Sequence, residues 1–263
     1  MEVDRAHGGR LASLVVDGHE LLVRAVPGDP RVPTDPLLWG CYPMAPWAGR
    51  TRGGRWVWGE TLHELTPNHA GHAMHGTVFD RRWMVELQDD GYVRLRADLQ
   101  PGWPYAGWVI HEVALMADRV ELRLEVHAES ATFPAVCGWH PWFRRLLDTG
   151  DAVTIDLEAK RWYPRDVDGL PLGRIEPTPL RRGPWDDCFA AVTWPVTLTW
   201  PGALAVRISS TCDHVVRYDQ PRHAVCIEPQ TGPPDALNHL HLATVVRPGR
   251  PLVAEMSIVW STG

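Results

Sequence analysis

The chain has 263 residues, of which 44% are hydrophobic and 22% charged, and its formal net charge at pH 7 is −6. This composition is typical of a globular protein with a sizeable core, and it argues against intrinsic disorder. The acidic balance argues against nucleic acid as a partner, because phosphates are normally bound by a basic patch, and nothing favours a membrane partner.

The cysteines and the start of the chain predict a cytoplasmic protein. The five cysteines are odd in number, widely scattered and without a Cys-x-x-Cys pair, a pattern typical of a reducing compartment. The N-terminal residues lack the apolar core of a signal peptide, and no segment approaches the ~18 apolar residues that a membrane span needs.

Alternation of apolar and polar residues predicts strands along the whole chain. Asp90-Gly91 separates two such segments and predicts a tight hairpin turn, because both residues tolerate positive φ. The predicted strands, in chain order, lie at 83–87, 93–99, 120–126, 153–157, 196–200, 204–208 and 254–258.

Helices are not expected in the core. No window holds an apolar stripe of 3.6-residue period long enough for a core helix, and the 23 glycines and 24 prolines interrupt regular structure throughout. Many short strands with Gly- and Pro-rich connections predict an all-β fold, a large antiparallel β-sandwich, in a single domain spanning 1–263. The stretch from Pro164 to Pro184 is the longest predicted loop, and long loops in compact domains are often functional.

Four short segments place polar or ionisable residues among glycine, proline and aromatic residues, where packing alone would not require them. They are 42–50 (YPMAPWAGR), 69–76 (HAGHAMHG), 138–143 (GWHPWF) and 226–231 (CIEPQT), and a weaker fifth is 185–189 (WDDCF). The 14 tryptophans add to this pattern, since an exposed subset of indole rings would suit stacking on sugars.

The histidines His69, His72 and His75 could indicate a metal site, because imidazoles are common zinc ligands. Their spacing of three brings ligands together on a helix, whereas Gly71 and Gly76 predict a loop at this place. We therefore predict no bound metal.

The chain carries acids and bases without the motifs of nucleophilic or cofactor-dependent enzymes. It has neither a Gly-x-Ser-x-Gly nucleophile elbow nor a phosphate-binding glycine loop, so we predict no cofactor. A glycoside hydrolase or lyase could pair Glu228 with Asp186 or Asp187 but not with both, because adjacent residues of a strand point to opposite faces. The remaining His, Glu, Asp and Arg residues favour proton transfer on a small polar molecule.

These segments, in this order, resemble the aldose 1-epimerase (galactose mutarotase) family from about Pro43 to Asn238, and most closely its shorter bacterial members. The stretch 47–56 (WAGRTRGGRW) resembles a family segment in which Asn usually stands at the position of Gly49. The other matching motifs are His75-Gly76 followed by Trp83, His140-Pro141-Trp142-Phe143, the acidic pair at 186–187, Glu-Pro-Gln at 228–230 and Pro-Asp-Ala-Leu-Asn at 234–238.

The resemblance implies the galactose mutarotase-like supersandwich and a cofactor-independent isomerase that interconverts the α and β anomers of a free hexose. It assigns Glu228 as the base at the C1 hydroxyl and His140 as the acid at the ring oxygen. It assigns contacts with the sugar to Arg50, His75, Trp83 and Asp186, with Asp187 as the second choice for the last. A carboxylate and an imidazole in contact are expected to favour each other's charged forms. The implied partner is a small-molecule sugar, and the protein is expected to be a monomer or a homodimer.

Other interpretations remain open. The family includes enzymes for phosphorylated and sulfonated hexoses, and in such an enzyme Arg81 or Arg82 would bind the anion. A non-catalytic carbohydrate-binding protein would keep the sandwich and the tryptophan surface. His140 could also be a buried imidazole with both nitrogens hydrogen-bonded, and Glu228 the buried ion-pair partner of Arg50.

Overall fold

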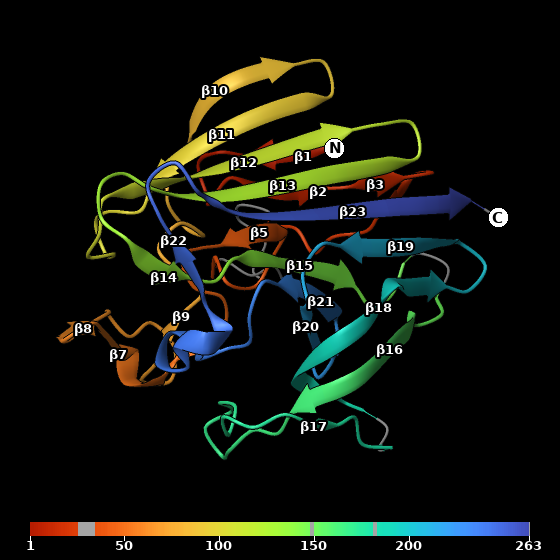
Figure 1. Ribbon diagram of the computed structural model, residues 1–263. Helices are drawn as coiled ribbons and strands as arrows, with labels where there is room; N and C mark the ends of the chain where they lie inside the picture. The colour runs from red at the N-terminus through yellow and green to blue at the C-terminus, as the bar shows by residue number, and fades with distance from the viewer. Residues whose placement is uncertain (26–34, 148–149, 181–182, 263) are drawn as a thin grey trace.

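The structure is a computed structural model that describes residues 1–25, 35–147, 150–180 and 183–262 (Figure 1). Its regular elements are strands and three short 3-10 helices. They are β1 (Glu2–Asp4), β2 (Arg10–Ser13), β3 (Val15–Val16), β4 (His19–Glu20), β5 (Cys41–Met44), β6 (Arg50–Thr51), η1 (Arg52–Gly54), β7 (Arg55–Trp58), β8 (Thr61–Glu64), β9 (Ala73–Met74), β10 (Met84–Asp89), β11 (Tyr92–Asp98), β12 (Gly107–Leu115), β13 (Arg119–Ala128), β14 (Phe133–Ala135), β15 (Gly138–Arg144), β16 (Thr154–Tyr163), β17 (Glu176–Pro177), β18 (Asp186–Trp200), β19 (Leu204–Ser210), β20 (His214–Tyr218), β21 (Ala224–Gln230), η2 (Ala236–Asn238), η3 (Leu240–Leu242), β22 (Thr244–Val246) and β23 (Leu252–Thr262).

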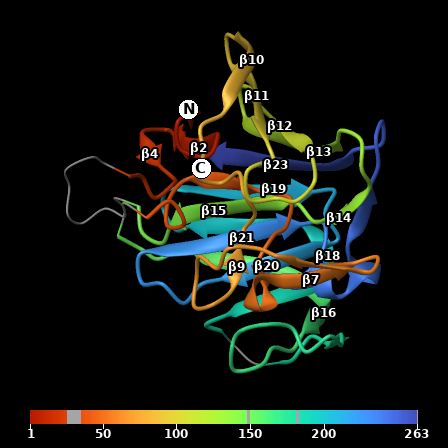
Figure 2. The same ribbon diagram turned by 90° about the vertical axis from the view of Figure 1, so that its left-hand side faces the viewer.

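The strands form a large antiparallel β-sandwich, as the sequence predicted. One continuous sheet runs in the order β1-β2-β5-β15-β21-β20-β18-β19-β23-β13-β12-β11-β10, with β16 and β17 attached at β18. The sheet folds back on itself, so that β10 to β13 and β23 form one layer and β5, β15, β21, β20 and part of β18 form the other (Figures 1 and 2). The pairing of β19 with β23 joins the two layers.

The first layer has the alternation that the sequence predicted. In β13, every second residue from Val120 to Ala128 is buried, and the residues between them are only half-buried. The predicted hairpin at Asp90-Gly91 is also confirmed, because Asp89 pairs with Tyr92 and Gly91 has a φ of 75°. These strands present one face to the core and the other to the surface.

The second layer is buried on both faces. All seven residues of β21 and six of the seven in β15 are buried. One face of each strand packs into the core, and the other lies under loops from several parts of the chain. Such strands show no apolar–polar alternation, which is why the sequence patterns did not predict β5, β15 and β21.

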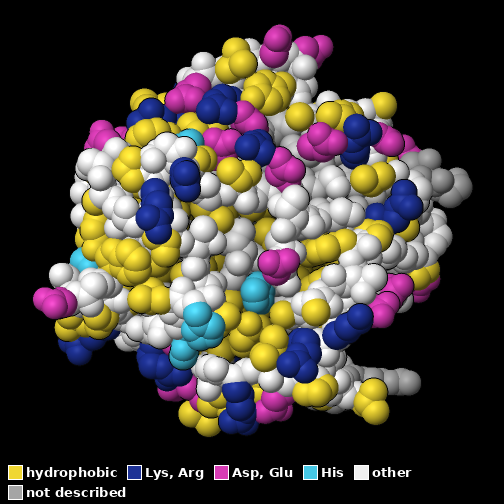
Figure 3. Space-filling view, in the orientation of Figure 1, with side chains coloured by type: hydrophobic (Ala, Val, Ile, Leu, Met, Phe, Trp, Pro, Cys, Tyr) yellow, Lys and Arg dark blue, Asp and Glu magenta, His cyan; other side chains and the backbone are white. Residues whose placement is uncertain are grey.

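The predicted long loop between Pro164 and Pro184 contains only the two-residue strand β17, which pairs with β16; residues 181 and 182 lie outside the described parts of the chain. Among the described residues, no helix has both the length and the apolar character that a membrane crossing needs. On the face drawn in Figure 3, basic and acidic side chains are interspersed rather than gathered by sign.

His111 connects the two layers in the core. The fully buried ring donates from Nδ1 to the carbonyl of Gly9 at 2.9 Å, and its Nε2 accepts the indole N–H of Trp139 at 3.1 Å. Both nitrogens are therefore satisfied only when the ring is neutral. Burial lowers the pKa of His111 to about 4.

We expect His111 to make the fold sensitive to acid. The unfolded chain takes up a proton near pH 6.5, whereas the folded protein resists it down to about pH 4, so this stabilisation is complete above pH 6.5 and is lost as the pH falls toward 4. Between pH 7 and pH 5 the loss from this residue is about 2 kcal/mol of unfolding free energy. Urea unfolding at the two pH values should therefore show a smaller loss for His111→Gln than for wild type. The exposed His241→Gln is the control and should follow wild type; equal losses in all three proteins would contradict the assignment.

Candidate active site

A cavity of about 260 Å³ opens on the outer face of the second layer. Alternation in the strands below it decides which side chains reach it: β15 contributes His140 and Trp142, and β21 contributes Glu228 and Gln230. The rest of the wall comes from neighbouring strands and covering loops, including Asp35, Leu37, Tyr42, Gly49, Arg50, His69, His75, Tyr163, Arg165, Gly169, Pro171, Asp186, Asp187, Cys188, Tyr218 and Pro234.

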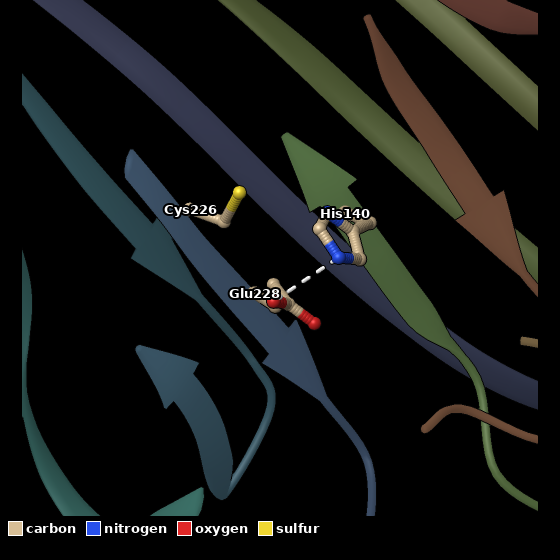
Figure 4. Close-up of side chains that lie close together, drawn as sticks. All are labelled: His140, Cys226 and Glu228. Atoms are coloured by element: carbon tan, nitrogen blue, oxygen red, sulfur yellow. Dashed lines mark ion pairs between the residues drawn. The ribbon is translucent and has the colours of Figure 1, made fainter. Parts of the chain in front are cut away.

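His140 and Glu228 face each other across two neighbouring strands. The register that pairs Gly138 with Gln230 and Trp142 with Cys226 brings the two residues level with each other. His140 Nε2 lies 3.3 Å from Glu228 Oε1, and the two residues are only 5% and 3% exposed (Figure 4). A carboxyl and an imidazole, 88 residues apart in sequence, are thus in contact at the floor of the cavity.

Aromatic rings fix the orientation of the His140 imidazole. It lies between the rings of Tyr42 and Trp142, with centroid distances of 4.9 and 5.2 Å and interplanar angles of 23° and 14°. The ring of His75 meets it edge to face at 5.1 Å. This packing leaves the imidazole little freedom to turn, so Nε2 stays directed at Glu228.

Burial sets the protonation of this pair. Desolvation raises the pKa of Glu228 well above its usual value, and the charge of Asp186 adds to the rise, while Arg50 and a hydrogen bond from Gln230 oppose it. Desolvation lowers the pKa of His140 to about 3. Contact was expected to favour both charged forms, whereas burial favours the neutral form of each group.

His75 presents a hydrogen-bond donor to the cavity. The backbone N–H of Gly49 donates to His75 Nδ1 at 3.2 Å, and burial lowers the pKa of His75 well below its usual value. The neutral ring then carries its proton on Nε2, which is free to donate to a bound oxygen. Gly49 is also suited to this place because its φ is +70° and a Cβ atom would lie 2.6 Å from Cβ of Pro234.

Arg50 lies half-buried in the cavity wall, and its Nε has no hydrogen-bond partner. In the described parts of the chain, no carboxylate lies within ion-pair distance of its guanidinium. The alternative in which Glu228 is simply the ion-pair partner of Arg50 is therefore wrong. Arg50 retains hydrogen-bonding capacity for a ligand.

Asp186 and Asp187 both line the cavity, so the expectation that only one of them could reach it is wrong. They are the first two residues of β18, and Arg165 from the long loop spans them. Its Nη1 lies 2.5 Å from Asp186 Oδ2, and its Nε lies 3.3 Å from Asp187 Oδ1. Asp187 is buried, whereas Asp186 keeps partial exposure toward the cavity.

Trp83 corrects another expectation. It is 1% exposed in the core, where its indole N–H donates to the carbonyl of Val78 at 3.0 Å, and it does not line the cavity. This placement replaces the expected sugar contact with a packing role. Arg81 and Arg82 are also absent from the cavity wall, and the guanidinium of Arg81 already donates to the carbonyls of Asp98, Gln100 and Pro101.

Gln230 is a cavity residue that the sequence analysis did not select. It is fully buried, its Nε2 donates to Glu228 Oε2 at 3.3 Å, and its Oε1 has no hydrogen-bond partner. The signal was present in the Glu-Pro-Gln motif, because residues two apart on a strand share a face. A hydroxyl in the cavity could donate to this oxygen.

Two groups could be considered for a metal ion. His69, His72 and His75 do not converge, since His72 Nδ1 accepts the N–H of Gly53 and His75 Nδ1 that of Gly49. Within the described residues, the one group with suitable geometry is His140, Cys226 and Glu228, whose donor atoms lie within 4.8 Å of one another (Figure 4). Burial raises the pKa of the Cys226 thiol well above its usual value, which disfavours the thiolate that a metal would need.

A family model described as aldose 1-epimerase matches residues 5–259. The chain belongs to the aldose 1-epimerase family. A curated relative, the uncharacterized protein YphB of Escherichia coli K-12, is 28% identical over 203 residues, which cover 74% of this chain and 63% of YphB. The match thus spans less than two thirds of that relative's length.

Solved structures of other family members share the fold. A protein of Escherichia coli K-12 matches with a TM-score of 0.81 at 23% identity, over 97% of this chain and 94% of the other. A GalM/aldose epimerase homologue from C. elegans matches with a TM-score of 0.80 at 17% identity, over 97% of this chain and 94% of the other. A galactose 1-epimerase from Lactobacillus acidophilus matches with a TM-score of 0.77 at 16% identity, over 98% of this chain and 90% of the other. At these sequence identities, the structural similarity shows that the proteins share the β-sandwich fold.

Gly49→Ala should destabilise the protein more than Gly53→Ala does. Both glycines have positive φ, at +70° and +58°, so each substitution carries the cost of a left-handed conformation, about 1 kcal/mol. Only at Gly49 does the new methyl group also meet Pro234, whereas nothing lies within 4 Å of a Cβ at Gly53. Thermal unfolding of both variants tests this difference. If both variants lose the same amount of stability, Pro234 moves to accommodate the methyl group, and Gly49 is not required for close packing.

Proposed function

We propose that this protein is an aldose 1-epimerase that interconverts the α and β anomers of a free hexose without a cofactor. The observation that carries the proposal is the contact between His140 and Glu228 at the floor of a cavity of small-molecule size. Mutarotation needs one group to remove a proton from the C1 hydroxyl and another to protonate the ring oxygen. A carboxyl group and an imidazole in contact meet this need.

In the proposed reaction, Glu228 takes the proton of the C1 hydroxyl while His140 gives a proton to the ring oxygen. The electron pair of the O1–H bond forms the C1=O1 double bond, and the C1–O5 bond breaks with its electrons on O5. The open aldehyde rotates about C1–C2. Reclosure on the other face returns each proton, so both groups finish as they began.

The pair must pass between two protonation states for this cycle. Burial favours a neutral Glu228 and a neutral His140, whereas ring opening uses the carboxylate and the imidazolium. Transfer of one proton across the 3.3 Å contact converts one state into the other without changing the net charge. Because imidazolium is disfavoured here, it is a strong acid toward the weakly basic ring oxygen when it does form.

The remaining cavity groups are proposed to hold the sugar. His75 Nε2–H and the guanidinium of Arg50 would donate to sugar oxygens. Asp186, with Asp187 behind it, and Gln230 Oε1 would accept sugar hydroxyls. These contacts place donors and acceptors on several sides of a polyol, which is the arrangement that orientation of a hexose requires.

Glu228→Gln and His140→Gln should each reduce mutarotation by roughly 10² to 10⁴-fold, because each removes one proton-transfer group but keeps the shape of the site. Polarimetry or NMR of freshly dissolved α-glucose, α-galactose and a panel of other aldoses measures the rate. Sugar affinity, measured by NMR titration, should change far less. EDTA-treated protein serves as a control for a metal at His140, Cys226 and Glu228, and it should keep full activity.

The same assays separate the alternatives. Sugar binding without acceleration of any sugar on the panel would indicate a carbohydrate-binding protein. Release of reducing ends from a glycoside would indicate a hydrolase or lyase that uses Glu228 with Asp186 or Asp187. Either result would overturn the proposed mutarotase.

The charges of the cavity support a neutral sugar rather than a phosphorylated or sulfonated one. Asp35, Asp186, Asp187 and Glu228 supply four carboxyl groups, whereas the guanidinium groups are those of Arg50 and Arg165. Arg165 is already paired with the two aspartates. An added anion would meet surplus negative charge, and such like-charge contacts are costly in a desolvated site.

Hexose 6-phosphate should therefore bind several-fold more weakly than the matching free hexose, and Arg82→Ala should change neither affinity. Isothermal titration of both ligands against wild type and Arg82→Ala checks this. Tighter binding of the phosphate that is lost in Arg82→Ala would instead restore Arg82 as an anion clamp.

We further propose that the protein acts in the cytoplasm as one catalytic domain, as a monomer or a homodimer. The five cysteines support the location, because all are buried free thiols, as is common in a reducing compartment.

A further inference from the structure

Arg10, which lies behind the active site, is the one completely buried arginine among the described residues. It lies on β2, is 0% exposed, and donates to four backbone carbonyls at 2.6 to 2.8 Å, those of His7, Pro36, Trp39 and Phe79. Among the described residues, no carboxylate lies within ion-pair distance of it. Burial lowers its pKa to about 10, which leaves it charged at neutral pH.

A stack of rings connects this charge with the catalytic pair. The guanidinium carbon lies 4.0 Å from the centroid of the Trp39 indole and 5.1 Å from that of the Tyr42 ring. Tyr42 stacks on His140 at 4.9 Å, and His140 faces Glu228. A buried charge without a counter-ion thus lies one aromatic ring away from the imidazole.

We infer that Arg10 is a positioning residue whose uncompensated charge acts across the Tyr42 ring on the His140–Glu228 pair and favours the deprotonated forms of both groups. The inference rests on the proposed function, in which this pair moves the protons. Arg10 touches neither the cavity nor the sugar, so its effect on the reaction is electrostatic.

The size of the effect follows from the geometry. The two ring separations place the charge no more than about 10 Å from the imidazole, and with an effective dielectric constant near 20 a unit charge at that distance changes a pKa by about one unit. Arg10 indeed contributes to the lowered pKa of His140, after the larger contribution of burial. A low pKa makes the imidazolium a stronger acid toward the ring oxygen.

Other charged and titratable groups also surround the pair. They are Cys226 on β21, His75 after β9, Arg50 on β6, Tyr42 on β5 and Asp186 on β18. All of them lie in or beside the cavity, where a bound sugar would change their surroundings. Arg10 differs because the ring of Tyr42 separates it from the cavity, and its charge is constant through the reaction. Asp4 and Asp80 are the carboxylates whose charges act on Arg10, both from beyond ion-pair distance.

The test neutralises the charge without removing Arg10. Trp39→Glu places a carboxylate where the indole now covers the guanidinium, and Trp39→Gln is the matched control of the same size without charge. Both variants keep Arg10 and its carbonyl hydrogen bonds, so they should fold even if replacement of Arg10 does not succeed. Arg10→Gln and Arg10→Lys form a second pair, in which only the lysine keeps the charge.

Two readouts follow the effect. The first is the pH dependence of kcat/KM for mutarotation, whose two limbs report the apparent pKa values of the coupled pair. The second is the NMR titration of the His140 Cε1 carbon, assigned by its absence in His140→Gln, which needs no activity. In Trp39→Glu and Arg10→Gln we expect both limbs to move to higher pH, with a shift of about one unit at His140. Trp39→Gln and Arg10→Lys should stay close to wild type.

The outcomes separate this inference from the proposed function. Identical titrations of His140 in Trp39→Glu and Trp39→Gln would overturn the role of Arg10 even if the enzyme is an active mutarotase. A shifted His140 titration in a protein without mutarotase activity would support the coupling and overturn the proposed function. A shifted titration with unmoved rate limbs would overturn the part of the inference that links Arg10 to the reaction.

Discussion

The contact between His140 and Glu228 depends on a layer of sheet that is buried on both faces. β15 and β21 each send alternate residues into the core, where Trp139 and Phe143 pack, and the residues between them toward the cavity. The core therefore fixes the backbone of the catalytic strands, and the antiparallel register aligns the two reacting groups. Placing such groups on rigid strands rather than loops holds them at a defined separation.

Burial on both faces also determines the chemistry. A carboxyl in water would be ionised and an imidazole mostly neutral, and no proton would be held between them at neutral pH. In this cavity desolvation raises the pKa of Glu228 and lowers that of His140, so the proton shifts toward the carboxyl group. The hydrogen bond from Gln230 and the charge of Arg50 limit the rise at Glu228, so the carboxylate remains accessible during the cycle.

Much of the fold could be predicted from the sequence, because surface strands carry a visible pattern. The segments at 93–99 and 120–126 face solvent on one side, so polar residues mark every second position, and the hairpin between β10 and β11 is marked by Asp90-Gly91. The strands β15 and β21, which carry His140 and Glu228, lack this pattern because nearly all of their residues are buried. For the site itself, the short motifs selected Arg50, His75, His140, Asp186 and Glu228, which do line one cavity. A short motif does not show whether a residue is buried in the core, however. Trp83 was therefore expected to contact the sugar although it is a core residue. Arg165 was not selected, because only the tertiary structure brings its loop across Asp186 and Asp187.

Arg10 illustrates how far a site can extend beyond its cavity. Nothing in its local sequence distinguishes it from the other arginines of the chain. Its partners are the carbonyl oxygen of nearby His7 and those of two distant segments, 36–39 and Phe79, which reach it only in the folded protein. Burying an unpaired cation is costly even with four of its five N–H groups bonded to carbonyls, and a neutral side chain could have filled the same space. Gly40 indicates how closely the backbone is built around it, since a Cβ there would lie 2.9 Å from Cδ of Arg10. A neutral side chain would fill the space at a lower desolvation cost, so packing does not explain why an arginine stands here. An effect of its charge on the neighbouring His140–Glu228 pair does explain it.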